Sequence, residues 1–329
     1  MTRRFAVALV VTSAVLVGAS MVSLTLGPME TTASEVWAAL VSPGTGDPTT
    51  VTIVREIRLP RLVTACVAGW GLALAGLCFQ SLLKNALASE YTLGVASGAS
   101  LGAVAGAVLG FTGTFAVSAG AFVGAIATIA IVLLVAHASF SFETHATILA
   151  GIIFTSLANA ILSLLLTLVS PNQLQSFFFW FLGSFASATW EGTVPVAIAT
   201  AILSAGIFGF GWQMNAIAVN EDLARQVGIS VKRTKLALYG VASLLTALIV
   251  SIAGTIGFVG LVVPHLARLV VGADNRRLIP LVAVMGAALC VVSDLIARTM
   301  LSPTELPVGV VTALVGVPVF VLLMQRRPR

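Results

Sequence analysis

Long apolar runs separated by short polar breaks constrain this chain of 329 residues more than any other feature of its sequence. A helix needs about 20 apolar residues to cross the hydrocarbon core of a bilayer, and helices are favoured there because each satisfies its own backbone hydrogen bonds. The sequence therefore predicts an all-α polytopic membrane protein, one domain over residues 1–329 with about ten transmembrane helices. The spans are expected roughly at residues 5–26, 62–83, 93–110, 114–137, 146–170, 193–211, 236–257, 258–272, 279–300 and 308–325.

The first and the eighth runs are the least like ordinary spans. Arg3 and Arg4 precede the first run, as basic residues do in a cleaved signal peptide. The run is longer than such peptides use and further spans follow, so we expect residues 1–26 to form an uncleaved first helix. The eighth run is short and is interrupted by Pro264, which makes it the least regular of the expected spans.

The distribution of Lys and Arg residues predicts how the chain is oriented. If the N-terminus is cytoplasmic, most of the 17 basic residues fall on the inner side, including the C-terminal Arg326, Arg327 and Arg329. The outer ones are then Arg55, Arg58, Arg61 and Arg298. Because cytoplasmic loops are enriched in Lys and Arg, both termini are expected in the cytoplasm. Orientation and anionic lipid headgroups account for the pI of 9.6, so no nucleic-acid partner is needed.

Residues 27–60 are expected to lie outside the membrane on the side opposite the termini. Their ETTASEVWAAL portion has an apolar side and a polar start, with Thr32 or Ser34 as a helix cap. This pattern predicts a short interfacial helix. Trp37 would then lie at the headgroup level, where amphipathic rings are enriched.

Residues 213–235 form a polar stretch between two apolar runs, in a chain that is only 9% charged. Asn220 can cap a short helix whose first turn begins with Glu221, and a carboxylate there suits the positive end of the helix dipole. Gly228 can take the left-handed conformation that ends a helix, and Ser230 can cap the next one. A solvated loop and a docking surface for a soluble partner both fit this helix, glycine and helix pattern.

Glycine recurs every four residues along the third expected span, at Gly94, Gly98, Gly102, Gly106 and Gly110. One flank of that helix would then have no side chains, so a neighbouring helix could approach its backbone closely. The stripe predicts close packing inside one subunit. A face lining a pore, or a face joining two subunits, is the alternative.

Few polar side chains lie within the expected spans, and each is a candidate for a structural or functional role. Gln80 and Asn159 are expected to form hydrogen bonds between helices. Asp294 and Arg298 are four residues apart, so they can form an ion pair on one helix face, with substrate contact as the alternative role of Asp294. His265 follows Pro264 at an expected bend. The cysteines Cys66, Cys78 and Cys290 show no metal-ligand spacing and are expected to pack as small apolar residues.

Several catalytic motifs are absent from the sequence. It has no G-x-x-x-x-G-K-[ST] phosphate loop, so the chain is not expected to hydrolyse ATP by itself. It also has no H-E-x-x-H, paired-cysteine or G-x-S-x-G motif, so no catalytic residues and no metal site are predicted. A transporter is therefore favoured over a membrane enzyme. One alternative is a secondary transporter coupled to ions or protons, with Asp294 or His265 as the relay.

Long motifs in both halves of the chain resemble the FecCD family. They are RLPRLVTACVAGWGLALAGLCFQSLLKNALASEYTLGVASGAS in the first half, then GFVGLVVPHLARLVVGADNRRLIP and SDLIARTMLSPTELPVGVVTALVGVPVFVLLMQRR in the second. The resemblance runs from about residue 55 to the C-terminus and implies a permease subunit of an ABC importer for ferric siderophore, haem or cobalamin. Where the family commonly reads R-N-P-L-A, this chain has Lys84 to Ala88 without the proline, which makes helix continuation easier.

The resemblance also implies partners in the bacterial cytoplasmic (inner) membrane. Two cytoplasmic ATP-binding subunits would carry ATP and Mg²⁺, while this chain would bind no cofactor. Residues 213–235 would form the coupling helices that these subunits contact, through Asn220, Glu221, Ala224, Arg225, Gln226, Gly228 and Val231. A substrate-binding protein outside would dock on Arg58, Arg61 and Arg298 through its carboxylates.

A dimer follows from the same resemblance, because the translocation path would lie between this chain and a second permease copy or a paralogue. Residues 236–329 would supply the C-terminal helices of the subunit. The fifth span and the segment after it would line the path, here through Thr155, Ser156, Asn159, Phe177 and Phe178. Contact of these phenylalanines with lipid is the alternative interpretation.

Overall fold

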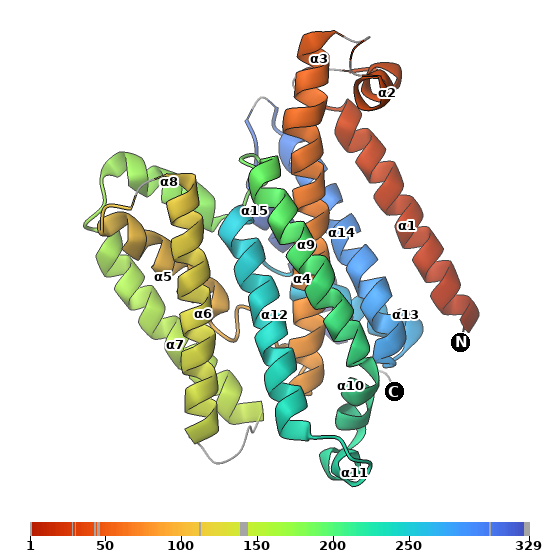
Figure 1. The fold of residues 1–329 in the computed structure, drawn as a ribbon, viewed down its shortest axis with the longest axis vertical. Coiled ribbons are helices and arrows are strands. Elements are labelled where there is room, and N and C mark those ends of the chain that lie inside the picture. The colour runs from red at the N-terminus through yellow and green to blue at the C-terminus, as the bar shows by residue number, and fades with distance from the viewer. Residues whose placement is uncertain are drawn as a thin grey trace.

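The computed structural model describes residues 2–325 apart from 28, 30, 43, 45–46, 112, 139–143 and 303, and Figure 1 shows its helical architecture. The described part of the chain contains helices and no strands. The helices of the first half are α1 (Thr2–Thr25), α2 (Ala33–Val41), α3 (Pro48–Thr52), the π-helical segment η1 (Ile53–Arg58), α4 (Leu59–Leu82), α5 (Val95–Val108), α6 (Thr114–Ala138), α7 (Thr144–Leu166) and α8 (Pro171–Phe181). Those of the second half are α9 (Trp190–Gly209), α10 (Gly211–Val219), α11 (Glu221–Gln226), α12 (Val231–Ala253), α13 (Val259–Val271), α14 (Asn275–Thr299) and α15 (Val308–Gln325).

The expected apolar segments all appear as helices. Within the described residues, 7 helices are long and apolar enough to cross a membrane, and the shorter apolar helices are Val95–Val108, Val259–Val271 and Val308–Leu322. The prediction of an all-α, multi-pass membrane protein is confirmed. The short eighth run is α13, whose 13 residues rise only about 20 Å, less than the hydrocarbon core.

Helix α4 lies at the centre of the subunit. In its most apolar window 83% of the residues are buried, whereas none is buried in the corresponding window of α1. Helices α9, α12, α13 and α14 contact α4, and α1 lies outside them against α14 (Figure 1). Lipid tails are as apolar as Leu72, Leu74 and Leu77 of α4, so close van der Waals packing, and not escape from water, holds these helices together.

The outer segment contains the predicted short helix, α2. Thr32 caps it, because the Thr32 hydroxyl accepts a hydrogen bond from the Glu35 N–H at 3.3 Å and Glu35 Oε2 accepts one from the Thr32 N–H at 2.8 Å. Trp37 is exposed, as an interfacial ring requires. A helix begins at Pro48 and continues through η1 into α4, so the last part of residues 27–60 is helical, and their place outside the membrane stays a prediction.

The glycine stripe packs over part of its length. A Cβ at Gly98 would lie 2.8 Å from the Gly124 carbonyl oxygen of α6, and one at Gly102 would lie 2.2 Å from that of Gly120. The prediction of close packing within the subunit is confirmed for these two glycines. It is wrong for Gly106, because among the described residues no atom of another element lies within 4 Å of a Cβ added there. Gly94 precedes α5 with a φ of 76° and forms the turn into the helix, and a Cβ there would lie 3.2 Å from the Gly151 carbonyl oxygen of α7, so this glycine is closely packed as well.

Different short helices lie at the two ends of the subunit. Helices α2 and α3 lie at one end and α11 at the other, and α1 begins at the α11 end (Figure 1). This agrees with a prediction that places the N-terminus and residues 213–235 on the same side. Arg326, Arg327 and Arg329, which the orientation argument counted, lie outside the described residues. The orientation itself stays a prediction.

Candidate functional site

The polar stretch 213–235 folds into α10, α11 and the start of α12. Asn220 caps α11 as predicted, since Asn220 Oδ1 accepts hydrogen bonds from the N–H groups of Asp222 at 2.7 Å and Leu223 at 3.2 Å. Gly228 has a φ of 85° and forms the predicted left-handed break. The prediction for Ser230 is wrong in one respect: it occupies the cap position of α12, but its side chain makes no capping hydrogen bond.

A small cluster of buried apolar side chains stabilises this segment. Ala224 and Val231 are buried there with Ile217 and Ile229. The resemblance predicts both residues at the contact with a partner, but in the structure they are buried and pack inside this segment. A short helix buries so little surface that it needs such a cluster to stay in place.

Ion pairs fix the same segment to α12 and to itself. Glu221 Oε1 lies 2.7 Å from Lys235 Nζ, and the Lys235 side chain is buried. Arg225 pairs with Asp222 at 2.6 Å on the exposed side, where ion pairs contribute about 0–1 kcal/mol. Gln226 is exposed as well. The outer surface of α11 therefore has a defined shape and presents Arg225 and Gln226.

Three apolar side chains on this surface were not predicted. Val219, Leu223 and Val227 are 79%, 54% and 61% exposed. Val219 ends α10, Leu223 lies on α11 and Val227 directly follows α11, so the exposed apolar side chains are spread along the whole segment. Together with Arg225 and Gln226 they give the segment both apolar and polar exposed side chains, which is the usual composition of a protein docking surface. We call these five residues the α11 surface.

At the other end of the molecule, the predicted docking arginines are buried. Arg58 donates to the carbonyl oxygens of Leu24 at 2.6 Å and Thr25 at 3.0 Å, and to the Thr31 hydroxyl at 2.7 Å. Arg298 donates to the Leu26 carbonyl oxygen at 2.9 Å and to the Ser23 hydroxyl at 2.7 Å. Both guanidinium groups thus fix the end of α1 to the rest of the subunit.

Arg61 is the centre of an ion network. Its guanidinium lies 2.9 Å from Asp294 Oδ1 and 3.0 Å from Glu305 Oε1, and it donates to both oxygens of Glu305. The predicted pair between Asp294 and Arg298 exists at 3.7 Å, but Arg61 is the closer partner of Asp294. Docking through these arginines stays a prediction, and in this conformation each already has internal partners. Asp294 is engaged by two arginines, an arrangement that gives no support to its use as a proton relay.

The predicted path residues lie on α7 and α8. The hydroxyls of Thr155 and Ser156 donate to carbonyl oxygens of their own helix, at 2.8 and 3.1 Å, and Asn159 is exposed on the same helix. Phe178 is exposed, but Phe177 is buried and stacks on Phe181 with ring centroids 6.1 Å apart. Ser156, Asn159 and Phe178 are therefore available to a ligand or partner, whereas Phe177 faces the protein.

The remaining polar residues of the expected spans make contacts inside the subunit. Gln80 forms the predicted hydrogen bonds between helices, to the carbonyl oxygens of Gly260 and Leu261. The His265 ring packs edge-on against Phe320, with centroids 5.8 Å apart. In the part of the chain that the structure describes, no group of three or more His, Cys, Asp or Glu side chains could hold a metal ion.

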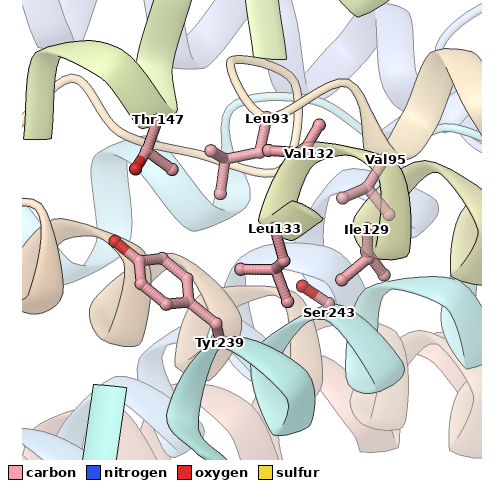
Figure 2. A pocket seen from close by; sticks show the side chains of 8 residues that line it. All are labelled: Leu93, Val95, Ile129, Val132, Leu133, Thr147, Tyr239 and Ser243. Carbon is pink, nitrogen blue, oxygen red and sulfur yellow. The ribbon is translucent and has the colours of Figure 1, made fainter. Parts of the chain in front are cut away.

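A small apolar pocket lies between the beginning of α5, α6, α7 and α12 (Figure 2). Leu93, Val95 and Leu133 are among the side chains that line it, and the Tyr239 and Ser243 hydroxyls border it. Because its lining is almost wholly apolar and carries no charged group, it offers no recognition site for a polar substrate.

Comparisons with known proteins agree with this architecture. The model of the FecCD transport family matches residues 15–326. The chain is 42% identical to the uncharacterized ABC transporter permease protein YvrB of Bacillus subtilis, over 88% of this chain and 83% of that one. It is 38% identical to the cobalamin import system permease protein BtuC of Halobacterium salinarum, over 84% and 74%. A solved structure of a proposed metal-chelate type ABC transporter, in an inward-facing conformation, matches with a TM-score of 0.85 and 30% identity over 97% and 99% of the two chains.

Proposed function

The chain belongs to the FecCD transport family, and from this premise we propose that it forms the translocation path for an iron chelate in an ABC importer. Ferric siderophore is the first candidate substrate, followed by haem and cobalamin. The cobalamin permease among its relatives supports the class of metal chelates. The chain acts on no bond of the substrate and serves as the membrane-spanning subunit.

The α11 surface is the observation that carries this proposal. Exposed apolar side chains gathered on one capped and ion-paired segment favour an interaction site that another protein covers. We propose that the partner is a cytoplasmic ATP-binding subunit, which binds ATP and Mg²⁺ while this chain binds neither. Two such subunits then serve a permease dimer made of two copies or of this chain and a paralogue.

The opposite end receives the substrate in this proposal. A substrate-binding protein docks near Arg58, Arg61 and Arg298 with carboxylates on its two lobes. Because these guanidinium groups already have internal partners, docking exchanges some of those contacts for new ones. We propose the bacterial cytoplasmic membrane as the location, with both termini in the cytoplasm.

The experiment combines copurification with a test of the α11 surface. The chain is expressed with the ATP-binding subunit encoded beside it, reconstituted in lipid, and assayed for ATP hydrolysis with the neighbouring binding protein loaded with ferric siderophore, haem or cobalamin. We expect one loaded binding protein to stimulate hydrolysis, and its ligand identifies the substrate. Failure of the unmodified chain to copurify with any ATP-binding subunit would refute the proposal.

Two variants locate the contact within the same experiment. Leu223→Asp places a charge among the exposed apolar side chains of the α11 surface and is expected to weaken ATPase-subunit binding at least tenfold, since a buried unpaired charge costs several kcal/mol. Arg225→Glu reverses the charge at its rim and is expected to weaken binding less. Arg4→Glu on α1 is the matched control for charge reversal. Equal binding by all these variants would place the contact elsewhere.

A further inference from the structure

A continuous series of polar side chains connects α10 with α4 and α13 at the inner end of the subunit. Asn215 of α10 accepts hydrogen bonds through Oδ1 from the backbone N–H of Asn275 at 2.8 Å and from its side-chain amide at 2.9 Å. Asn215 Nδ2 donates to Asp274 Oδ1 at 2.8 Å. Asn215 therefore binds the first turn of α14 through both ends of its amide.

The series continues from α14 to α4 and α13. Ser81 Oγ donates to Asn275 Oδ1 at 3.3 Å, and Arg268 of α13 donates both to Ser81 Oγ and to Gln80 Oε1. Gln80 Nε2 donates to the carbonyl oxygens of Gly260 at 3.2 Å and Leu261 at 3.0 Å, in the first turn of α13. We call Asn215, Asn275, Ser81, Arg268 and Gln80 the inner polar chain.

The inner polar chain begins close to the α11 surface. Asn215 is on α10, and the backbone N–H of Asn220, which caps α11, donates to the Ala216 carbonyl oxygen at 3.2 Å. A displacement of α11 therefore acts directly on the helix that carries Asn215.

The buried hydrogen bonds of the inner polar chain make this connection rigid. Gln80 and Asn275 are only 3% and 2% exposed, and a buried amide that loses its partner costs about 1–3 kcal/mol. Two helices joined by apolar contacts can shift past each other, whereas hydrogen bonds of Gln80 and Asn275 fix the relative position of the helices that they join. Beside Gln80 the two backbones also touch, because a Cβ at Gly76 would lie 1.9 Å from the Gly260 carbonyl oxygen. The first turn of α13 therefore moves with α4 and not independently of it.

We propose that Asn215, Asn275 and Gln80 are positioning residues that carry movement of the α11 surface to α4 and the first turn of α13. This inference rests on the proposed function, in which an ATP-binding subunit moves the α11 surface. Breaking the inner polar chain then separates ATP hydrolysis from transport. It leaves the α11 surface itself intact.

The test measures ATP hydrolysed per substrate transported, in proteoliposomes that hold the whole complex. Asn215→Leu and Gln80→Leu remove the hydrogen bonds at nearly constant volume. Thr246→Val is the control, because Thr246 is equally buried but, among the described residues, its hydroxyl donates to the Ala242 carbonyl oxygen of its own helix and to no other helix. We expect both Leu variants to copurify with the ATP-binding subunit and hydrolyse ATP, with transport per ATP reduced at least tenfold. We expect Thr246→Val to keep the wild-type ratio.

A second measurement covers the case in which a Leu variant does not fold. Spin labels on exposed sites of the otherwise unmodified complex, Ala218→Cys on α10 and Leu269→Cys on α13, are each paired with Val10→Cys on α1. We expect both distances to change together when ATP binds. Movement of α10 without α13, or an unchanged transport ratio in folded Leu variants, would overturn the inference. Loss of copurification by the wild-type chain would instead overturn the proposed function.

Discussion

The contact between α4 and α14 offers a sharp test of how closely packed backbones hold this subunit together. At this crossing a Cβ added to Gly69 would lie 2.0 Å from the Gly286 carbonyl oxygen, and one added to Gly286 would lie 2.2 Å from that of Gly69. Real Cβ atoms do not approach other atoms within 3.0 Å, so Gly69→Ala forces the two helices apart by about 1 Å.

The magnitude follows from two opposing terms. A gap of this size forfeits about a quarter to a half of the dispersion energy of the surrounding contacts, and overpacking of cores costs about 1–3 kcal/mol. The upper end applies because the obstacle is backbone and cannot rotate away. Alanine in place of glycine stabilises a helix by about 1 kcal/mol. We expect a net destabilisation of about 2 kcal/mol.

The assay is reversible unfolding in mixed detergent micelles, followed by tryptophan fluorescence. Gly18→Ala in α1 and Gly240→Ala in α12 are matched controls, since both glycines are exposed and have no atom within 4 Å of an added Cβ. These variants should be as stable as the wild type or more stable by up to about 1 kcal/mol. A Gly69→Ala protein that unfolds with the controls would refute the reasoning.

Three further predictions concern caps and charges. Asn220→Ala removes the acceptor for two N–H groups and should reduce α11 stability by about 1 kcal/mol, seen as faster amide hydrogen exchange there and unchanged exchange in α2. Arg61→Leu leaves buried Asp294 without its closest partner and should lower the free energy of unfolding by about 3–5 kcal/mol. Adding Asp294→Leu should recover most of this loss, and a double variant as unstable as the single one would contradict the prediction. Hydrogen bonds from Thr32 lower the pKa of Glu35. Protection of the α2 amides from hydrogen exchange should therefore be full above the usual carboxyl pKa and should decline as the pH falls through the lowered value. Glu35→Gln should abolish this dependence when amide exchange is measured as a function of pH.

Local rules predicted a large part of this structure. The apolar runs gave the helices because a bilayer imposes a minimum length, and the caps at Thr32 and Asn220 depend only on residues two or three positions away. The resemblance of long motifs to a known family predicted the architecture and the transport role.

The features that sequence reasoning missed depend on distant parts of the chain. Asp294 was paired with Arg298, its neighbour on the same helix, because the approach of Arg61 from α4 is decided by the packing of α4 on α14. The glycine period could not show that α6 covers Gly98 and leaves Gly106 open. The resemblance places Ala224 at the partner contact and could not show its burial, which depends on apolar side chains before and after α11.

The helical stretch that begins at Pro48 and ends at Leu82 is slightly longer than a bilayer is thick. Its 35 residues correspond to about 52 Å, or about 49 Å along the membrane normal at an average tilt of 20°. A bilayer with its headgroups is about 40–45 Å thick. With the α2 end on the outer side, as the orientation predicts, this excess length would raise the start of the helix above the lipid, and a water-soluble protein would meet it before it touched the headgroups.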